Sequence, residues 1–180
     1  FDYYASKKYF VGKGIIVTGA TGGIGSLLTK TLCDLGAKVV AVVKDDKKFN
    51  YQLRQYLNNT SFEFEKIDFC DNINVVEEFT NIMIKLNGKL DIMFLCHGRF
   101  DTSELIETNN KDFDIAVNTN TRSLMTMISL ATPFLKLTRG NIVAISSLES
   151  FIPVKGSFLN TVTKSMANML IQSSALELAP

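Results

Sequence analysis

The chain has 180 residues, of which 46% are hydrophobic, and its 19 basic and 18 acidic residues leave a net charge of +1. That length is enough for one well-packed domain and too short for two ordinary ones. The balanced charge provides no field that would attract nucleic acid or an anionic membrane. No apolar stretch is long enough to span a bilayer, so the sequence predicts no transmembrane segment.

The cysteines and the single histidine bound the chemistry further. Cys33, Cys70 and Cys96 are odd in number and lack a Cys-x-x-Cys spacing, which indicates neither a disulfide framework nor a zinc site. They favour a reducing intracellular compartment, either the cytoplasm or the mitochondrial matrix. His97 is the only histidine, so a histidine-based triad and a multi-histidine metal site are excluded. Cys96 and His97 would point to opposite faces of a strand, which argues against a thiol enzyme.

Strand-like and helix-like segments alternate along the chain. Short runs rich in Val, Ile and Phe predict buried parallel strands at residues 14–18, 38–43, 62–67, 91–95 and 141–146. Helices are expected at residues 23–35, 47–57, 72–86, 111–137 and 157–178. Gly36 and Gly88 are expected to close helices, and Asp71 is expected to cap one. The sequence therefore predicts an α/β fold with a doubly wound parallel sheet in the order 3-2-1-4-5.

A glycine-rich turn joins the first expected strand to the first helix. The segment reads Thr18-Gly19-Ala20-Thr21-Gly22-Gly23-Ile24-Gly25. Such a turn lets the backbone approach a pyrophosphate closely and aims the helix N-terminus at its charge. Because strand, loop and helix follow in the required order, the motif predicts a dinucleotide-binding domain over residues 12–180. Residues 1–11 form an N-terminal arm, which either docks on a partner or leads into the fold as an extended segment.

The glycine spacing, with Thr18-Gly19 followed by Gly23 and Gly25, resembles that of the short-chain dehydrogenase/reductase (SDR) family. Further landmarks agree in order: Asp68 after the third strand, Asn118 in a helix, Ser147 after the fifth strand and Lys164 seventeen residues later. The resemblance implies a Rossmann-like SDR fold. It also implies that two more strands and a substrate loop would follow residue 180. Without them the fifth strand lies at a sheet edge, so we expect either that the sequence continues or that another chain completes the sheet.

The resemblance implies hydride transfer between a nicotinamide and a carbonyl or alcohol, with a tyrosine exchanging the proton. A lysine would lower the pKa of that tyrosine and hold the ribose, a serine would bind the carbonyl oxygen, and an asparagine would support a proton path. The matching catalytic residues here are Asn118, Ser147 and Lys164. The matching cofactor-binding residues are Thr18, Gly19, Thr21, Gly23, Ile24, Gly25, Lys44, Asp68, Gly98 and Lys164. The helices at 111–137 and 157–178 match those through which SDR subunits associate, although the apolar stripe of the first could equally pack inside its own domain.

Cofactor preference is set at the end of the second strand. A carboxylate there would bind the ribose diol of NAD, whereas a basic residue suits the extra phosphate of NADP. The position is occupied by Val43 and is followed by Lys44, which favours NADP(H) over NAD(H). Asp45 and Asp46 follow at once, so a shift of one residue would restore an acid.

The chain departs from the family pattern at the residues that matter most for catalysis. The tyrosine position, four residues before Lys164, is Asn160, and all five tyrosines lie in the first third of the chain. An asparagine amide does not exchange protons near neutral pH. The usual Asn-Asn-Ala-Gly run is replaced by Leu95-Cys96-His97-Gly98, and the glycine expected shortly after Ser147 is absent.

Three functions are therefore open. The favoured one is a catalytically impaired or inactive accessory subunit of a larger intracellular assembly. The second is an active NADP-dependent oxidoreductase in which Ser147, a water or a group outside this chain replaces the phenol. The third is a binding module whose affinity for a partner responds to NADP(H).

Overall fold

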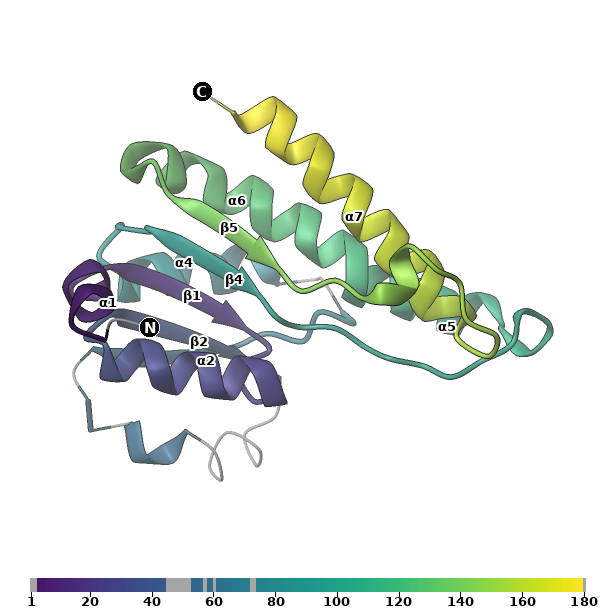
Figure 1. Cartoon of the computed structure of the whole chain (residues 1–180), viewed down its shortest axis with the longest axis horizontal. Helices are drawn as coiled ribbons and strands as arrows, with labels where there is room; N and C mark the ends of the chain where they lie inside the picture. The colour runs from purple at the N-terminus through teal and green to yellow at the C-terminus, as the bar shows by residue number, and fades with distance from the viewer. Residues whose placement is uncertain (1–2, 45–52, 57, 60, 72–73, 180) are drawn as a thin grey trace.

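The computed structural model describes residues 3–44, 53–56, 58–59, 61–71 and 74–179 (Figure 1). Its strands are β1 (Gly14–Thr18), β2 (Lys38–Val43), β3 (Phe62–Lys66), β4 (Ile92–Leu95) and β5 (Asn141–Ala144). Its longer helices are α1 (Tyr3–Phe10), α2 (Gly23–Asp34), α4 (Val75–Lys85), α5 (Asn110–Val117), α6 (Ser123–Thr138) and α7 (Phe158–Leu178). Short 3₁₀ turns lie at η1 (Arg54–Tyr56), η2 (Leu105–Glu107) and η4 (Leu148–Ser150), and η3 (Asn118–Arg122) is a turn of π-helix.

All the strand pairs are parallel, and the strands lie in the order β3-β2-β1-β4-β5. Val17 of β1 lies opposite Ala41 of β2 and Phe94 of β4. The predicted doubly wound parallel sheet is therefore confirmed. Because β1 is central, the loop that follows it emerges where the connections of the two halves of the sheet diverge, which is where ligands bind in this class of fold.

Helices cover both faces of the sheet, with α2 on one face and α4, α6 and α7 on the other (Figure 1). Ile15 packs in one hydrophobic cluster with Leu32 of α2. Its neighbour Ile16 packs in the other cluster with Phe79 of α4 and Met127 of α6. Successive strand residues point to opposite faces, so the apolar run of β1 serves both layers.

The edge strands correct the expectation that all five strands are buried. Glu63 of β3 is exposed, as are Asn141 and Val143 of β5. Val143 keeps 43% of its surface in solvent. Both strands have a neighbour on only one side within the described part of the chain. Some side chains of these two edge strands therefore remain in contact with solvent, whereas those of β1, β2 and β4 are mostly buried.

The glycines predicted to close helices agree with the structure, whereas the aspartate predicted to cap a helix does not. Gly36 and Gly88 have φ angles of +84° and +73° and close the turns after α2 and α4, as expected. The expected cap at Asp71 is wrong, because α4 begins at Val75. Asp71 instead lies in a turn that its own N–H closes onto the carbonyl of Asp68 at 3.1 Å.

Two helix predictions fare differently. Much of the helix expected at 47–57 lies outside the described residues, and the described Arg54–Tyr56 forms only a 3₁₀ turn. The helix expected at 111–137 is present but interrupted, because the π-helical turn Asn118–Arg122 separates α5 from α6. A π-turn takes up an extra residue, and it therefore changes which side chains face the sheet.

The N-terminal segment is a helix and not the extended lead-in that was one of the two expectations. Phe10, at the end of α1, packs against the core cluster on the α2 face. Between α1 and β1, the Gly12 N–H donates a hydrogen bond to the carbonyl of Gly36 at 3.0 Å, which holds this connection in place. Within the described residues, no helix has the length and apolar character needed to cross a membrane.

Candidate functional site

A cavity of about 440 Å³ opens at the carboxyl ends of the central strands. Gly19, Thr21, Lys44, Asp68 and Gly98, all predicted to bind a cofactor, line it. The rest of its lining consists of Gly22, Val42, Val43, Ile67, Phe69, Cys70, Cys96, His97, Arg99 and Thr119. We refer to this cavity as the crevice.

The glycine turn forms one wall of the crevice and is tightly packed on its inner side. Gly19 has a φ of +62°, and a Cβ atom there would lie 2.7 Å from Cα of His97. A Cβ on Gly25 would lie 2.2 Å from the carbonyl oxygen of Gly19. A Cβ on Gly23, in contrast, would meet nothing within 4 Å. Two glycines are thus required by the packing of the turn, and the third leaves the N-terminus of α2 open to a ligand.

The other residues predicted to bind a cofactor do not line the crevice. Thr18 is fully buried, and its Oγ1 accepts a hydrogen bond from the Cys96 N–H at 3.1 Å. Ile24 is 60% exposed in the first turn of α2, beside Gly23 and Gly25. Thr18 therefore links β1 to the end of β4 on the buried side of the glycine turn.

Lys44 and Asp68 pair with each other across the crevice rim, 3.1 Å apart. Lys44 also donates to Sγ of Cys70 at 3.3 Å. Burial lowers the pKa of Lys44, but the hydrogen bonds with Asp68 and Cys70 outweigh it, so that the pKa is raised. Burial alone would raise the pKa of Asp68, but the hydrogen bonds from the Cys70 N–H and from Lys44 outweigh this effect, so the pKa of Asp68 is lowered. Both groups are therefore charged at neutral pH, and the Lys44 side chain is 61% exposed toward solvent.

His97 joins the glycine turn to α6 through a buried chain of hydrogen bonds. Its Nδ1 lies 2.6 Å from Oγ1 of Thr18, and its Nε2 lies 2.7 Å from Oγ of Ser123. The Ser123 hydroxyl donates to the carbonyl of Thr119 at 2.7 Å, so we assign Nε2 as the protonated ring nitrogen. Phe69 stacks on the imidazole with ring centroids 4.0 Å apart. Burial, aided by the charge of Lys164, lowers the pKa of His97 to about 3.

This pKa predicts a pH-dependent stability. In the unfolded chain His97 takes up a proton below about pH 6.5, whereas in the fold it stays neutral down to about pH 3. Stability is therefore complete above the unfolded pKa and declines as the pH falls below it. We expect the free energy of unfolding to drop by about 2 kcal/mol between pH 6.5 and pH 5. Urea unfolding at several pH values measures this, and H97Q should show a flatter slope; equal slopes would contradict the assignment.

Asn120, and not the predicted Asn118, lies with Lys164. Asn120 is 1% exposed, and its Oδ1 accepts from the Arg99 N–H at 2.7 Å. Its Nδ2 donates to the carbonyl of Arg99 and to Oγ1 of Thr163, each at 2.9 Å. Asn118 instead donates to the carbonyl of Cys70 at 3.4 Å and accepts from Arg122.

Lys164 is a buried cation with little to balance it. It is 8% exposed, and its Nζ donates to the carbonyl of Ile145 at 3.0 Å. The same Nζ lies 3.2 Å from the point where a Cβ on Gly98 would be, so that it adjoins the crevice. Burial lowers the pKa of Lys164. Among the residues that the structure describes, no carboxylate pairs with it. A buried ammonium of this kind is costly, and such groups concentrate at functional sites.

Glu149, which the sequence did not point to, lies beside both Ser147 and Asn160. Ser147 begins the η4 turn, and its Oγ accepts from the Glu149 N–H at 3.2 Å. Asn160, at the tyrosine position, is 4% exposed, and its Nδ2 donates to the carboxylate of Glu149. The site thus holds a serine, an amide, a carboxylate and a lysine on the loop after β5 and the first turns of α7.

A model of the family described as short chain dehydrogenase matches residues 13–180. The chain belongs to this short-chain dehydrogenase family. An "uncharacterized oxidoreductase" of Staphylococcus epidermidis is 27% identical over 168 residues, which are 93% of this chain and 72% of that protein. A chloroplastic tropinone reductase homolog of Arabidopsis thaliana is 28% identical over 171 residues, 93% of this chain and 53% of that protein.

Solved structures show the same fold. An apo SCOR enzyme from Clostridium thermocellum superposes with a TM-score of 0.85 at 21% identity, covering 93% of this chain and 68% of that one. A short-chain dehydrogenase from Streptomyces avermitilis gives a TM-score of 0.86 at 19% identity, covering 94% of this chain and 61% of that one. The Rossmann-like SDR fold is therefore shown, together with membership of a family that binds NAD(P)(H), and the matched proteins are longer than the segment they share with this chain.

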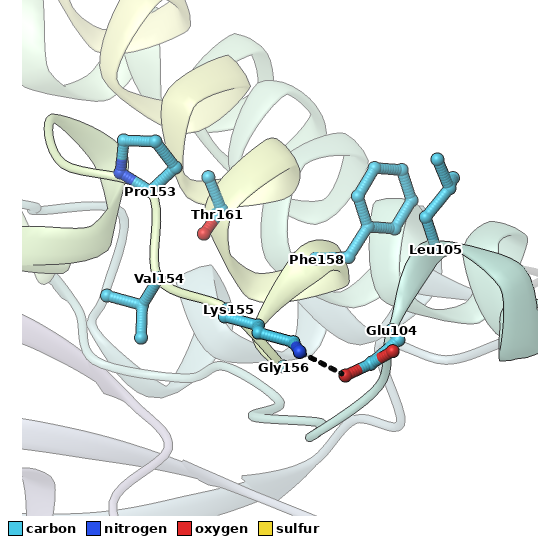
Figure 2. Close-up of a pocket in the computed structure, with 8 residues that line it drawn as sticks. All are labelled: Glu104, Leu105, Pro153, Val154, Lys155, Gly156, Phe158 and Thr161. Atoms are coloured by element: carbon cyan, nitrogen blue, oxygen red, sulfur yellow. Dashed lines mark ion pairs between the residues drawn. The ribbon is translucent and has the colours of Figure 1, made fainter.

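The cysteines, a metal site and a second cavity have less structural support as functional sites than the crevice has. All three cysteines are free thiols, and burial raises the pKa of Cys96, which disfavours its thiolate. Within the described part of the chain, no group of three His, Cys, Asp or Glu residues is placed to hold a metal ion. A second cavity of about 360 Å³ shares no lining residue with the crevice (Figure 2). It lies beside the start of α7, where Lys155 pairs with Glu104 at 3.7 Å.

Proposed function

We propose that this short-chain dehydrogenase binds NADP(H) in the crevice and transfers hydride between it and a carbonyl or alcohol substrate. The observation that carries the proposal is Lys164, a buried and nearly unpaired ammonium beside Gly98. An accessory subunit that binds nothing gains no stability from such a group, since an apolar side chain of similar size would pack there at lower cost. A ribose hydroxyl and a polarised substrate oxygen are the partners that such a cation suits.

The residues present fit a dinucleotide. The open N-terminus of α2 at Gly23 suits the pyrophosphate, and the exposed ammonium of Lys44 suits a ribose phosphate. The family resemblance assigns Asp68 to the adenine end and Lys164 to the nicotinamide ribose; Asp68 lines the crevice, and Nζ of Lys164 adjoins Gly98. The cofactor supplies the hydride when bound. Ser147 would hold the substrate oxygen, and Asn120 takes the role that the sequence assigned to Asn118, because it is the asparagine beside Lys164.

A non-catalytic subunit is the second candidate, and Asn160 is the observation that favours it. Exposed apolar side chains on α6 and α7, among them Met125, Met166 and Met169, would then contact another protein or a second copy of this chain. If that contact responded to the nucleotide, the chain would act as the NADP(H)-dependent binding module, which requires different affinities with and without the cofactor.

Fluorescence titration with NADPH and NADH, followed by turnover assays, separates these functions. We expect NADPH to bind about tenfold more tightly than NADH, equivalent to about 1.4 kcal/mol. We also expect NADPH oxidation in the presence of 4-nitrobenzaldehyde or cyclohexanone. Failure to bind either dinucleotide would overturn the proposal, and binding without turnover would establish the non-catalytic candidate instead.

A further inference from the structure

Glu149 lies against the side chain that occupies the tyrosine position. It belongs to the η4 turn, directly after Ser147. Its carboxylate accepts hydrogen bonds from Nδ2 of Asn160 and, at 3.4 Å, from Oγ of Ser157. Asn160 and Ser157 are only 4% and 5% exposed. Two buried donors at the start of α7 thus fix the position of this carboxylate.

The backbone of Glu149 and its partner Asn160 connect it to the rest of the site. The Glu149 N–H donates to Oγ of Ser147 at 3.2 Å, so the two residues share one tight turn. Asn160 and Lys164 are four residues apart on α7 and therefore share a helix face. Lys164 in turn adjoins Gly98, which lines the crevice. Glu149 is therefore linked through Asn160 to the face of α7 that borders the crevice.

A carboxyl group can do what the amide of Asn160 cannot. An amide only donates and accepts hydrogen bonds, whereas a carboxyl group gains and loses a proton and serves as a general acid or base. Building on the proposed function, we propose that Glu149 is the proton-carrying catalytic residue, and that Asn160 and Ser157 position it. Residue 160 then contributes to the same step as a tyrosine would, but by holding the acid instead of being the acid.

Glu149 would serve as the acid in carbonyl reduction and as the base in alcohol oxidation. In carbonyl reduction, the O–H bond of the Glu149 carboxyl group breaks and its proton goes to the substrate oxygen held by Ser147. The carbonyl carbon receives the hydride of the reduced dinucleotide. The products are the alcohol, the oxidised dinucleotide and the Glu149 carboxylate, which regains a proton from water. In alcohol oxidation, the carboxylate accepts the hydroxyl proton while the hydride of the alcohol carbon passes to the oxidised dinucleotide, which gives the carbonyl product.

E149Q tests the proposal, because glutamine keeps the size and an oxygen acceptor for Asn160 but cannot transfer a proton. We expect NADPH-dependent reduction of 4-nitrobenzaldehyde to fall about 10²- to 10⁴-fold. The affinity for NADPH should stay within about twofold, because Glu149 does not line the crevice. The pH dependence of the remaining rate should lose its acid-assisted limb. E177Q, at an exposed position near the end of α7, should match the unmodified chain.

Two further measurements make the result decisive. In protein labelled with ¹³C at the glutamate carboxyl carbon, the resonance lost in E149Q should shift when 4-nitrobenzaldehyde is added to the chain with NADP⁺ bound, a complex that cannot react; an unmoved resonance would overturn the proposal. Adding N160Y to E149Q should restore part of the turnover through a phenol beside Lys164. Unchanged turnover in E149Q would overturn the role of Glu149 and leave the proposed function standing. Absence of turnover in the unmodified chain with NADPH bound would overturn both.

Discussion

Replacing Gly25 with alanine is expected to lower the free energy of unfolding by about 3 kcal/mol and to abolish dinucleotide binding. The new Cβ would lie 2.2 Å from the carbonyl oxygen of Gly19 and 3.1 Å from Cα of Ala20. Both are backbone atoms, so no side-chain rotation relieves the clash. Gly19 has little room to retreat, because even a Cβ atom added to it would lie 2.7 Å from Cα of His97. The turn must therefore open, which displaces the N-terminus of α2 from the crevice.

Gly23 supplies the matched control in the same helical turn. G23A places its Cβ in open space, and alanine is favoured over glycine in a helix by about 0.5–1 kcal/mol. We expect G23A to be at least as stable as the unmodified chain while its NADPH affinity falls, because the added methyl group occupies the approach of the pyrophosphate. Chemical denaturation and fluorescence titration of the two variants test this. Equal stability of G25A and G23A would contradict the packing argument.

The strands could be predicted well because their signal is local. The apolar runs of β1 and β2 match their observed bounds, Gly14–Thr18 and Lys38–Val43. What the sequence could not show is how far each strand is covered. β3 alternates phenylalanine with glutamate, which is typical of a half-buried strand. β5 is as apolar as a central strand apart from Asn141, and its exposure depends on neighbours that the local pattern does not report.

The sequence predicts Asn118 as the helix asparagine of the site, and that role stays a prediction, whereas the structure brings Asn120 close to Gly98 and Lys164. Asn120 lies in the π-helical turn Asn118–Arg122, so the regular helix spacing from the buried Ala116 to the buried Leu124 does not continue through it. The family pattern alone could not separate two asparagines two residues apart, and the π-turn between α5 and α6 has no sequence signal.

Glu149 and His97 could not be assigned from sequence at all. Glu149 was noted only as part of a run that lacks a glycine, and its contact with Asn160 arises because the loop after β5 folds back onto α7. His97 was noted as a departure from the family pattern. Its partners Thr18 and Ser123 lie 79 and 26 residues away in the chain. Contacts of this kind depend on the tertiary fold, which places the ends of β1, β4 and α6 together.

Replacing Lys164 with methionine is expected to separate stability from function. Methionine is similar in length and carries no charge, so it removes the cost of burying an ammonium whose hydrogen bond is to the Ile145 carbonyl. We expect the free energy of unfolding to rise by about 1 kcal/mol. Because its Nζ adjoins Gly98, which lines the crevice, NADPH affinity should fall at least about tenfold, and turnover should fall by about 10²-fold or more.

K155M is the matched control, because Lys155 is exposed and its ion pair with Glu104 lies in the other cavity. It should change neither stability nor NADPH binding, since exposed ion pairs contribute about 0–1 kcal/mol. Denaturation and titration of both variants at one pH distinguish the cases. If K164M lost stability and kept its NADPH affinity, Lys164 would be a structural residue that anchors the carbonyl of Ile145, and the main support for a dinucleotide site would be gone. If K164M gained stability and lost affinity, the buried cation would be explained by the ligand that it binds.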